Sequence, residues 1–273
     1  MDSLSLTMTF VSILWMLVLN LQEVPQIEVY QVEKPGYVEI WARNPHVYPV
    51  TIELTAELEN LSSDKLIPHT DVLSPESNSK LVRLDPINDS SAWNFDTRFV
   101  TYKGDVFAQH QDDYAYQFPY RIGSSHLVSQ AYHGDFSHSG SAAYSIDFAM
   151  PEGTQIYAAR AGVVIEVVQR FNDGGNDKSF IDKANFVTIL HADGTMADYS
   201  HLRLNGARVA KGDEVKVGQF LGFSGATGFV TGPHLHIGIK KTVLGGKYET
   251  IQVKFATING PVTPTEGMSY TAY

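Results

Sequence analysis

The stretch GPHLHIGI at residues 232–239 decides what kind of fold and site this chain can build. In a β-strand, residues two apart project from the same face, with Cα atoms roughly 6.6 Å apart. His234 and His236 therefore share one face, while Leu235 and Ile237 point into the opposite layer. One imidazole can then bind a metal while the other reaches water beside it. A bare His-x-His also occurs as a pair of surface histidines, so the pattern needs further support.

The stretch YSIDFAMP at residues 144–151 supplies that support, because its large apolar residues alternate with small or polar ones. Asp147 stands on the small-residue face, where a carboxylate is costly unless a metal or a basic side chain pairs with it. His138 lies nine positions earlier, and this odd offset would put the two side chains on opposite faces of one regular strand. The chain must therefore turn between them, and Ser139-Gly140-Ser141 is suited to a turn.

A further histidine, His201, follows a strand-like run in the stretch YSHL at residues 199–202. Alone, it would be interpreted as structural. His191 precedes a turn and is either structural or a neighbour of the site. The remaining histidines have no partner in the pattern and are expected on the surface: His46, His69, His110, His126 and His133.

Composition limits the classes of function. The 273 residues carry a formal net charge of -10 and no clustered basic residues, which argues against nucleic acid and against anionic membranes as partners. The chain has no cysteine, so a metal site must use His, Asp and Glu, a donor set that suits zinc and other borderline metals.

The first 22 residues are expected to be a signal peptide or a membrane anchor, and the protein to be exported to the periplasm, cell envelope or extracellular space. Residues 6–21 (LTMTFVSILWMLVLNL) are uncharged and have the size of a signal-peptide core. No Lys or Arg precedes this run, and no small-x-small cleavage site follows it. Cleavage and retention therefore both stay open.

The rest of the chain is predicted to be all-β. Short runs rich in Val, Ile, Tyr and Thr, separated by turn signals, predict an amino-terminal β-sandwich over residues 26–104. Residues 105–123 are expected to link it to a second, glycine-punctuated β-rich domain over 124–241. Residues 242–273 form a β extension with one strand predicted at 249–255. The sandwich contains no chemical constellation.

Residues 130–241 resemble the lysostaphin/LytM-type zinc metallopeptidases of bacterial cell walls. Many ordered motifs carry the resemblance: Ser137-His138, Ile146-Asp147-Phe148 with Pro151 and Gly153-Thr154, AARAGVV at 158–164, YSHL at 199–202, KGDEV at 211–215, GFSGATG at 222–228 and TGPHLH at 231–236. The resemblance implies a domain built on an antiparallel sheet with an open groove.

It also implies the site. His138, Asp147 and His236 would hold one zinc ion, and His201 and His234 would be the catalytic histidines. Many members place the first ligand closer to the Asp, at the position that Ala143 occupies here. We therefore assign His138, as in variants with a longer insert, and keep His133 with Asp135 as the alternative.

The function implied is a zinc-dependent endopeptidase that hydrolyses peptide bonds in peptidoglycan stems or cross-bridges. A second class is a catalytically inactive relative that binds and activates other wall hydrolases. A third is a structural envelope protein, which would leave the convergent polar residues unexplained.

Overall fold

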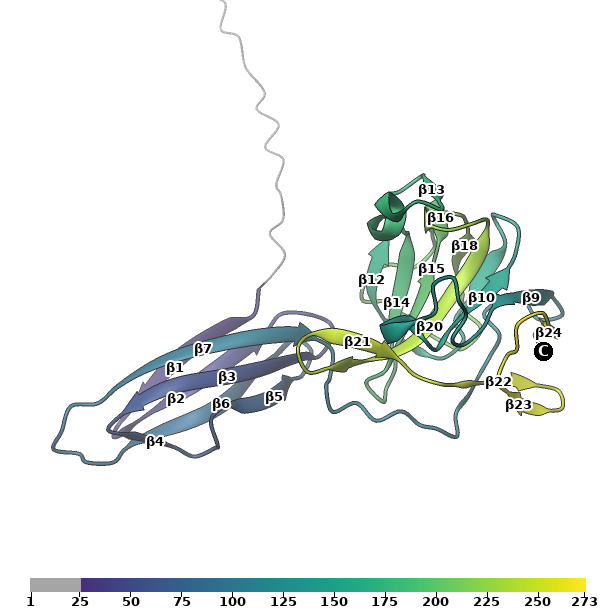
Figure 1. Cartoon of the computed structure of the whole chain (residues 1–273). Coiled ribbons are helices and arrows are strands. Elements are labelled where there is room, and N and C mark those ends of the chain that lie inside the picture. Colours follow the sequence, from purple (N-terminus) through teal and green to yellow (C-terminus); the bar gives the residue numbers. More distant parts are fainter. Residues whose placement is uncertain (1–25) are drawn as a thin grey trace, which may run out of the picture.

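The computed structural model describes residues 26–273, and the leader predicted at residues 1–22 lies outside this range. Figure 1 shows two β-rich parts joined end to side. Within residues 26–273 the helical segments are two short 3₁₀ turns, η1 (Gly140–Ala142) and η2 (Lys178–Lys183). No helix in this range is long and apolar enough to cross a membrane. The all-β prediction is confirmed.

The amino-terminal part is a sandwich of two antiparallel sheets, with strand orders β1-β2-β6-β4 and β5-β3-β7. The strands are β1 (Glu28–Lys34), β2 (Tyr37–Asn44), β3 (Val50–Glu59), β4 (Leu61–Ser63), β5 (His69–Leu73), β6 (Ser77–Pro86) and β7 (Asn94–Lys103). Alternating apolar residues from both sheets fill the space between them, among them Ile40, Ile52 and Leu81. The alternation of apolar and polar residues in the sequence therefore predicted which residues form the core of this sandwich.

The second part is organised by a large sheet with the order β17-β12-β14-β15-β20-β10-β9-β24, onto which β21 adds beside β20. Its strands are β9 (Ser125–Gln130), β10 (Ser145–Ala149), β12 (Gly162–Val168), β14 (Phe186–Leu190), β15 (Met196–Ser200), β17 (Glu214–Val215), β20 (His234–Val243), β21 (Lys247–Thr250) and β24 (Ser269–Thr271). The central strands β14, β15, β20 and β10 pair antiparallel throughout.

Smaller sheets complete the second part: β11-β18-β16, β13-β19 and β23-β22-β8. Their strands are β8 (Ala115–Tyr116), β11 (Gln155–Tyr157), β13 (Gly174–Gly175), β16 (Leu202–Ala207), β18 (Phe220–Ser224), β19 (Gly228–Phe229), β22 (Lys254–Thr257) and β23 (Gly260–Val262). They frame the large sheet and carry the loops beside the predicted site.

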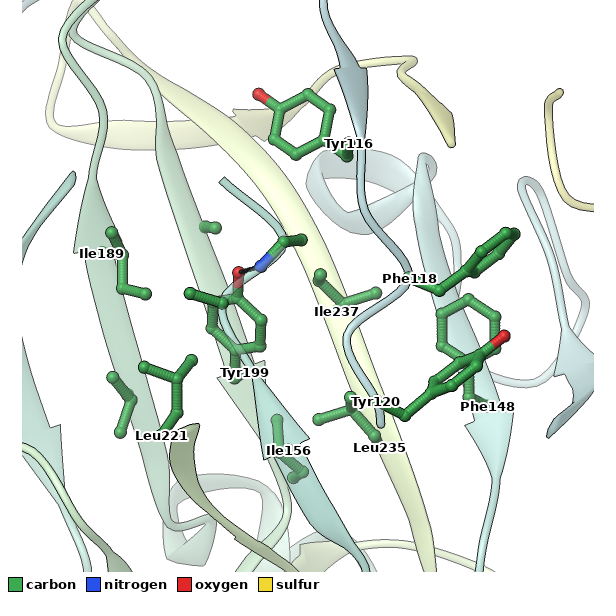
Figure 2. Packing of buried hydrophobic residues seen from close by; sticks show 14 of the residues in the cluster. Tyr116, Phe118, Tyr120, Phe148, Ile156, Ile189, Tyr199, Leu221, Leu235 and Ile237 are labelled. Atoms are coloured by element: carbon green, nitrogen blue, oxygen red, sulfur yellow. Dashed lines mark hydrogen bonds between the residues drawn. The ribbon is translucent and has the colours of Figure 1, made fainter. Parts of the chain in front are cut away.

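The hydrophobic core of this part lies on one face of the large sheet. Figure 2 shows Phe148 of β10, Tyr199 of β15 and Leu235 of β20 within it. The Tyr199 hydroxyl accepts a hydrogen bond from the backbone N–H of Ala159 at 2.8 Å, which satisfies a polar group buried among apolar side chains. Because side chains alternate along a strand, Asp147 and His236 are left on the other face.

The segment expected to be a linker, residues 105–123, is an integral part of this core. Tyr116, Phe118 and Tyr120 are each at most 3% exposed, and β8 pairs with β22 near the end of the chain. Figure 2 shows the segment running across the buried cluster. Residues 115–120 therefore belong to the core of the second part, and their alternation of aromatic and other residues is satisfied by partners distant in the sequence.

The strand predicted at 249–255 is broken into β21 and β22. The backbone N–H of Val253 donates to the Tyr132 hydroxyl at 3.0 Å, and that hydroxyl donates to the Val253 carbonyl at 2.8 Å. One side chain thus takes the place of a neighbouring strand, and the chain leaves the sheet edge between Thr250 and Lys254.

The two parts share a small junction. Tyr48 and Val50 of the sandwich pack with Ile165 and Met196 of the large sheet. The Thr242 hydroxyl donates to the Lys103 carbonyl at 2.7 Å. Lys103 also forms an ion pair with Glu166, so apolar burial and polar contacts both join the parts.

One buried histidine makes stability depend on pH. His191 is 2% exposed, and its Nδ1–H donates to the Ala161 carbonyl at 2.9 Å, while Nε2 has no hydrogen-bond partner. Burial lowers the pKa of His191 from 6.5 to about 4, against the opposing effect of the bond to Ala161. Between these two values the unfolded chain binds more protons than the folded one, so stability falls as pH falls.

We predict that the metal-free protein loses roughly 2.5 kcal/mol of unfolding free energy through His191 between pH 7.5 and pH 4.5. Replacing this residue by glutamine (His191→Gln) removes the titrating group and should flatten the pH dependence by that amount. Urea unfolding of both chains at several pH values measures the difference. Equal slopes in the two chains would show that His191 does not contribute to the pH dependence.

Candidate metal centre

The register between β10 and β20 builds the centre of the site. Asp147 lies directly opposite His236, and Ala149 lies opposite His234. These four side chains lie on the face away from the core, and Ala149 is the smallest of them. Asp147 Oδ1 is 2.8 Å from His236 Nδ1 and 3.7 Å from His234 Nε2.

His138 reaches the same point from the loop between β9 and β10. Gly140, at the start of η1, has a φ of +56°, so the chain turns at the predicted Ser-Gly-Ser stretch. The His138 side chain is fully buried, and its Nδ1–H donates to the Ala131 carbonyl at 2.8 Å. Its Nε2 lies 3.2 Å from Asp147 Oδ1 and 3.3 Å from His236 Nδ1.

These three atoms have the spacing of metal ligands. Ligand bonds of about 2.0–2.2 Å in a tetrahedral site place neighbouring ligand atoms about 3.4 Å apart, close to two of the three separations here. Because His138 uses its Nδ1–H on Ala131, a neutral His138 directs the lone pair of Nε2 at the carboxylate of Asp147. Two electron-rich atoms in contact are unfavourable unless a positive centre lies between them. The donor set therefore fits a bound cation.

The carboxylate of Asp147 is held in its charged form. Burial raises the pKa of Asp147, but its side-chain contacts with His138 and His236 and the charges of His236 and His234 more than offset burial and hold this pKa well below its ordinary value. The group is 6% exposed, and an isolated charge at that depth would be strongly unfavourable. Asp147 therefore offers an anionic side chain in a shielded position.

His201 and His234 stand beside this triad. β15 ends at Ser200, which pairs with His236, and the next residue has a left-handed backbone with a φ of 64°. Strain of this kind persists where surrounding contacts enforce it. The imidazoles of His201 and His234 have centroids 4.6 Å apart. The structure thus brings all five predicted site residues together.

Each of these two imidazoles is oriented by a backbone carbonyl. His201 Nδ1–H donates to Thr227 at 2.7 Å, and His234 Nδ1–H donates to Gly232 at 2.9 Å. In both rings Nε2 is then an acceptor. Burial, together with the nearby His234 and His236, lowers the pKa of His201 to about 3, which keeps this ring neutral at physiological pH.

The alternative first ligand, His133, is not in this group. His133 is exposed, has a φ of 59°, and packs its ring edge-on against Tyr144 with centroids 4.9 Å apart. Asp135 is exposed as well. Within the described residues, the group of potential ligands that lie within reach of one ion contains His138, Asp147 and His236.

Sequence reasoning missed two features of the site. The carbonyls that orient the histidines belong to residues without a chemical signal, such as Thr227. Phe136, two residues before His138, stacks on Phe229 of β19 with centroids 5.0 Å apart and planes 6° apart. This contact joins the loop that carries His138 to the loop that precedes β20. In the sequence, this contact could be suspected only from the presence of Phe136 and Phe229 in segments near the site.

A family model described as peptidase family M23 matches residues 141–250. The chain contains a peptidase family M23 domain. The matched residues include Asp147, His201, His234 and His236, whereas His138 lies just before them. The match thus covers most of the large sheet and four of the five candidate site residues, and it confirms the family resemblance that the motifs indicated.

Named relatives match the M23 domain. An uncharacterized metalloprotease of Buchnera aphidicola is 38% identical over 104 residues, 37% of this chain and 24% of that protein. Peptidoglycan DD-endopeptidase ShyA of Vibrio cholerae is 42% identical over 90 residues, 33% of this chain and 18% of that protein. Glycyl-glycine endopeptidase ALE-1 of Staphylococcus capitis is 34% identical over 93 residues, 34% of this chain and 23% of that protein. The chain therefore spans less than a quarter of the length of each relative.

We predict that replacing His138 by alanine (His138→Ala) abolishes metal binding, because it removes one of three converging donors. The matched control, His133→Ala, should keep its metal, since His133 lies on the surface. Elemental analysis of the purified full chains measures the bound metal. Loss of metal in the His133 variant, with retention in the His138 variant, would reverse the assignment.

Proposed function

We propose that this protein is a zinc-dependent endopeptidase that hydrolyses peptide bonds in bacterial peptidoglycan. The observation that carries the proposal is the convergence of His138 Nε2, His236 Nδ1 and Asp147 Oδ1 within 3.3 Å of one another, beside two further oriented imidazoles. Three protein ligands are the number found in catalytic zinc sites, which keep one position for water or substrate.

Zinc suits this donor set. Two imidazoles and one carboxylate without a thiolate are typical of catalytic zinc, whereas oxygen-only sets favour magnesium or calcium. A zinc ion held by His138, Asp147 and His236 would supply the Lewis acidity that activates water near neutral pH and polarises a carbonyl group. The protein contributes the fixed positions of the three donors.

His201 and His234 are proposed to move the proton. Their Nδ1–H groups are engaged by Thr227 and Gly232, so each ring presents an Nε2 lone pair. A neutral imidazole in that tautomer accepts a proton from attacking water and returns it to the leaving amine. Once protonated, it also stabilises negative charge that develops on the peptide oxygen. The backbone carbonyls keep both rings in this orientation.

The proposed substrate class follows from the relatives. ShyA is named a peptidoglycan DD-endopeptidase and ALE-1 a glycyl-glycine endopeptidase, so the matched domain occurs in enzymes that cut peptide bonds. We propose peptide stems or cross-bridges of peptidoglycan as the substrate. Because that polymer lies outside the cytoplasmic membrane, we propose that the protein acts in the periplasm, cell envelope or extracellular space.

The variants His201→Ala and His234→Ala should keep their zinc and lose at least about a hundredfold in activity, the usual effect of removing an acid–base or oxyanion group. His133→Ala, a surface control, should retain wild-type activity. The assay is the release of soluble peptides from isolated peptidoglycan, with zinc content measured on the same samples. A zinc-loaded wild-type chain that binds peptidoglycan without releasing peptides would favour the inactive, activating role.

The sandwich is proposed to position the enzyme rather than to take part in catalysis. Its junction with the M23 domain involves Tyr48, Val50 and Lys103, none of which is near the metal centre in the contacts described above. A chain starting at Asp105 should therefore bind zinc and cleave a soluble stem peptide within about tenfold of the full chain. Loss of cleavage in such a folded, zinc-loaded chain would show that the sandwich completes the site.

A further inference from the structure

His201 is the corner residue between two sheets. β15 of the large sheet ends at Ser200, β16 of a smaller sheet begins at Leu202, and the residue between them has a φ of 64°. A left-handed backbone is unfavourable for a residue with a Cβ atom, so neighbouring contacts must hold it. Before the corner, Ser200 is held by its pairing with Phe186 and His236. The position of the His201 ring therefore depends on what fixes the chain after the corner.

Asn185 fixes the chain after the corner from the position just before β14. Its backbone carbonyl accepts the N–H of Leu202 at 3.1 Å, and its Nδ2 donates to the Leu202 carbonyl, also at 3.1 Å. The same side chain bonds Phe171 twice, because Nδ2 donates to its carbonyl at 2.8 Å and Oδ1 accepts its N–H at 2.9 Å. Both donors and the acceptor of this fully buried amide are engaged, so the side chain has one orientation.

Thr227 holds both the chain and the ring of the histidine. Its Oγ1 accepts the backbone N–H of Asn185 at 3.0 Å and donates to the Leu202 carbonyl at 2.7 Å. Its own carbonyl accepts Nδ1–H of His201 at 2.7 Å. Thr227 is 3% exposed, so these bonds are shielded from water. The side chain of one residue thus ties down the corner, and its backbone orients the imidazole.

Glycines on both sides of Thr227 allow this close approach. A Cβ atom on Gly225 would lie 2.4 Å from the backbone nitrogen of Arg203. Gly228 has a φ of +85°, and a Cβ atom on it would lie 2.7 Å from Ala184 Cβ. Larger residues at either position would push the loop away from the corner. The loop is therefore built to pack against the segments before Asn185 and after Leu202.

We propose that Thr227 and Asn185 are positioning residues for His201. Their side-chain hydrogen bonds hold the Thr227 carbonyl and the Leu202 backbone in a fixed relation. This relation sets the Nδ1–H tautomer of His201 and the direction in which its Nε2 lone pair points. The two residues act through His201 and not on the metal ligands. The inference rests on the proposed function only in that His201 takes part in the reaction.

The kinetic test uses Thr227→Val, which keeps the shape of the side chain and removes the hydroxyl. In the full, zinc-loaded chain kcat should fall roughly tenfold or more, since a small misplacement of a catalytic group is costly, while KM and zinc content stay unchanged. Thr227→Ser keeps the hydroxyl and should recover most of this loss. In a chain that already carries His201→Ala, Thr227→Val should cause no further loss, because His201 is no longer there to be positioned.

A second measurement does not depend on activity. Proton–nitrogen correlation spectra of the histidine rings, recorded on the full chain at neutral pH, report which ring nitrogen carries the proton. The His201 signal is assigned by its absence in His201→Ala. It should show a protonated Nδ1 that exchanges slowly with water in the wild type and fast in Thr227→Val. A His201 ring protonated on Nε2 in the wild type would overturn the inference.

Thr188→Val is the matched control. Thr188 is also 3% exposed, but its hydroxyl donates to Asp198 at 2.7 Å, away from the His201 corner. This variant should lower thermal stability and leave both kcat and the His201 signal unchanged.

The outcomes separate this inference from the proposed function. Equal losses from Thr227→Val in the wild-type and His201→Ala backgrounds would show a general structural role and refute the positioning role. Wild-type kcat together with an unchanged His201 signal would refute it as well. If the wild-type chain does not cleave peptidoglycan, the proposed function fails, and the ring spectra still decide whether Thr227 and Asn185 position His201. If Thr227→Val does not fold, Asn185→Ser in the same two backgrounds takes its place under the same criteria.

Discussion

The pairing of β10 with β20 is the constraint on which the rest of the second part depends. Its register sets Asp147 against His236 on one face and places Phe148 and Leu235 in the core on the other. A slip by one residue would exchange the two faces, burying the carboxylate among aromatic rings and exposing the apolar residues. Burial of the large apolar residues therefore fixes the register, and the register fixes the positions of Asp147 and His236.

The site is costly for the fold because it gathers buried polar groups. Asp147 and the fully buried His138 are removed from water, and their approach is favourable only around a positive charge. The core on the opposite face offsets this cost, since Tyr116, Phe118 and Tyr120 bury large aromatic side chains in it. A cation bound at this site would therefore stabilise the protein, because it would favour only the folded chain.

Precision at the site comes mainly from the backbone. His138, His201 and His234 are oriented by the carbonyls of Ala131, Thr227 and Gly232. These carbonyls lie just beyond the ends of β9, β19 and β20, so the tautomers follow from the path of the chain rather than from neighbouring side chains. The loops themselves meet through the stacked rings of Phe136 and Phe229. A substitution in these loops can therefore disturb the site without touching a ligand.

The sequence alone determined the features that follow from local alternation. The period of two in the stretches around Asp147 and His236 placed both on one face, and ordered motifs indicated the M23 family. The tertiary structure decided what depends on distant partners. It set His138, rather than His133, beside Asp147, and it buried residues 115–120 against strands near the chain terminus. Local periodicity indicates which face of a strand a residue occupies, but it does not indicate which distant segment packs on that face.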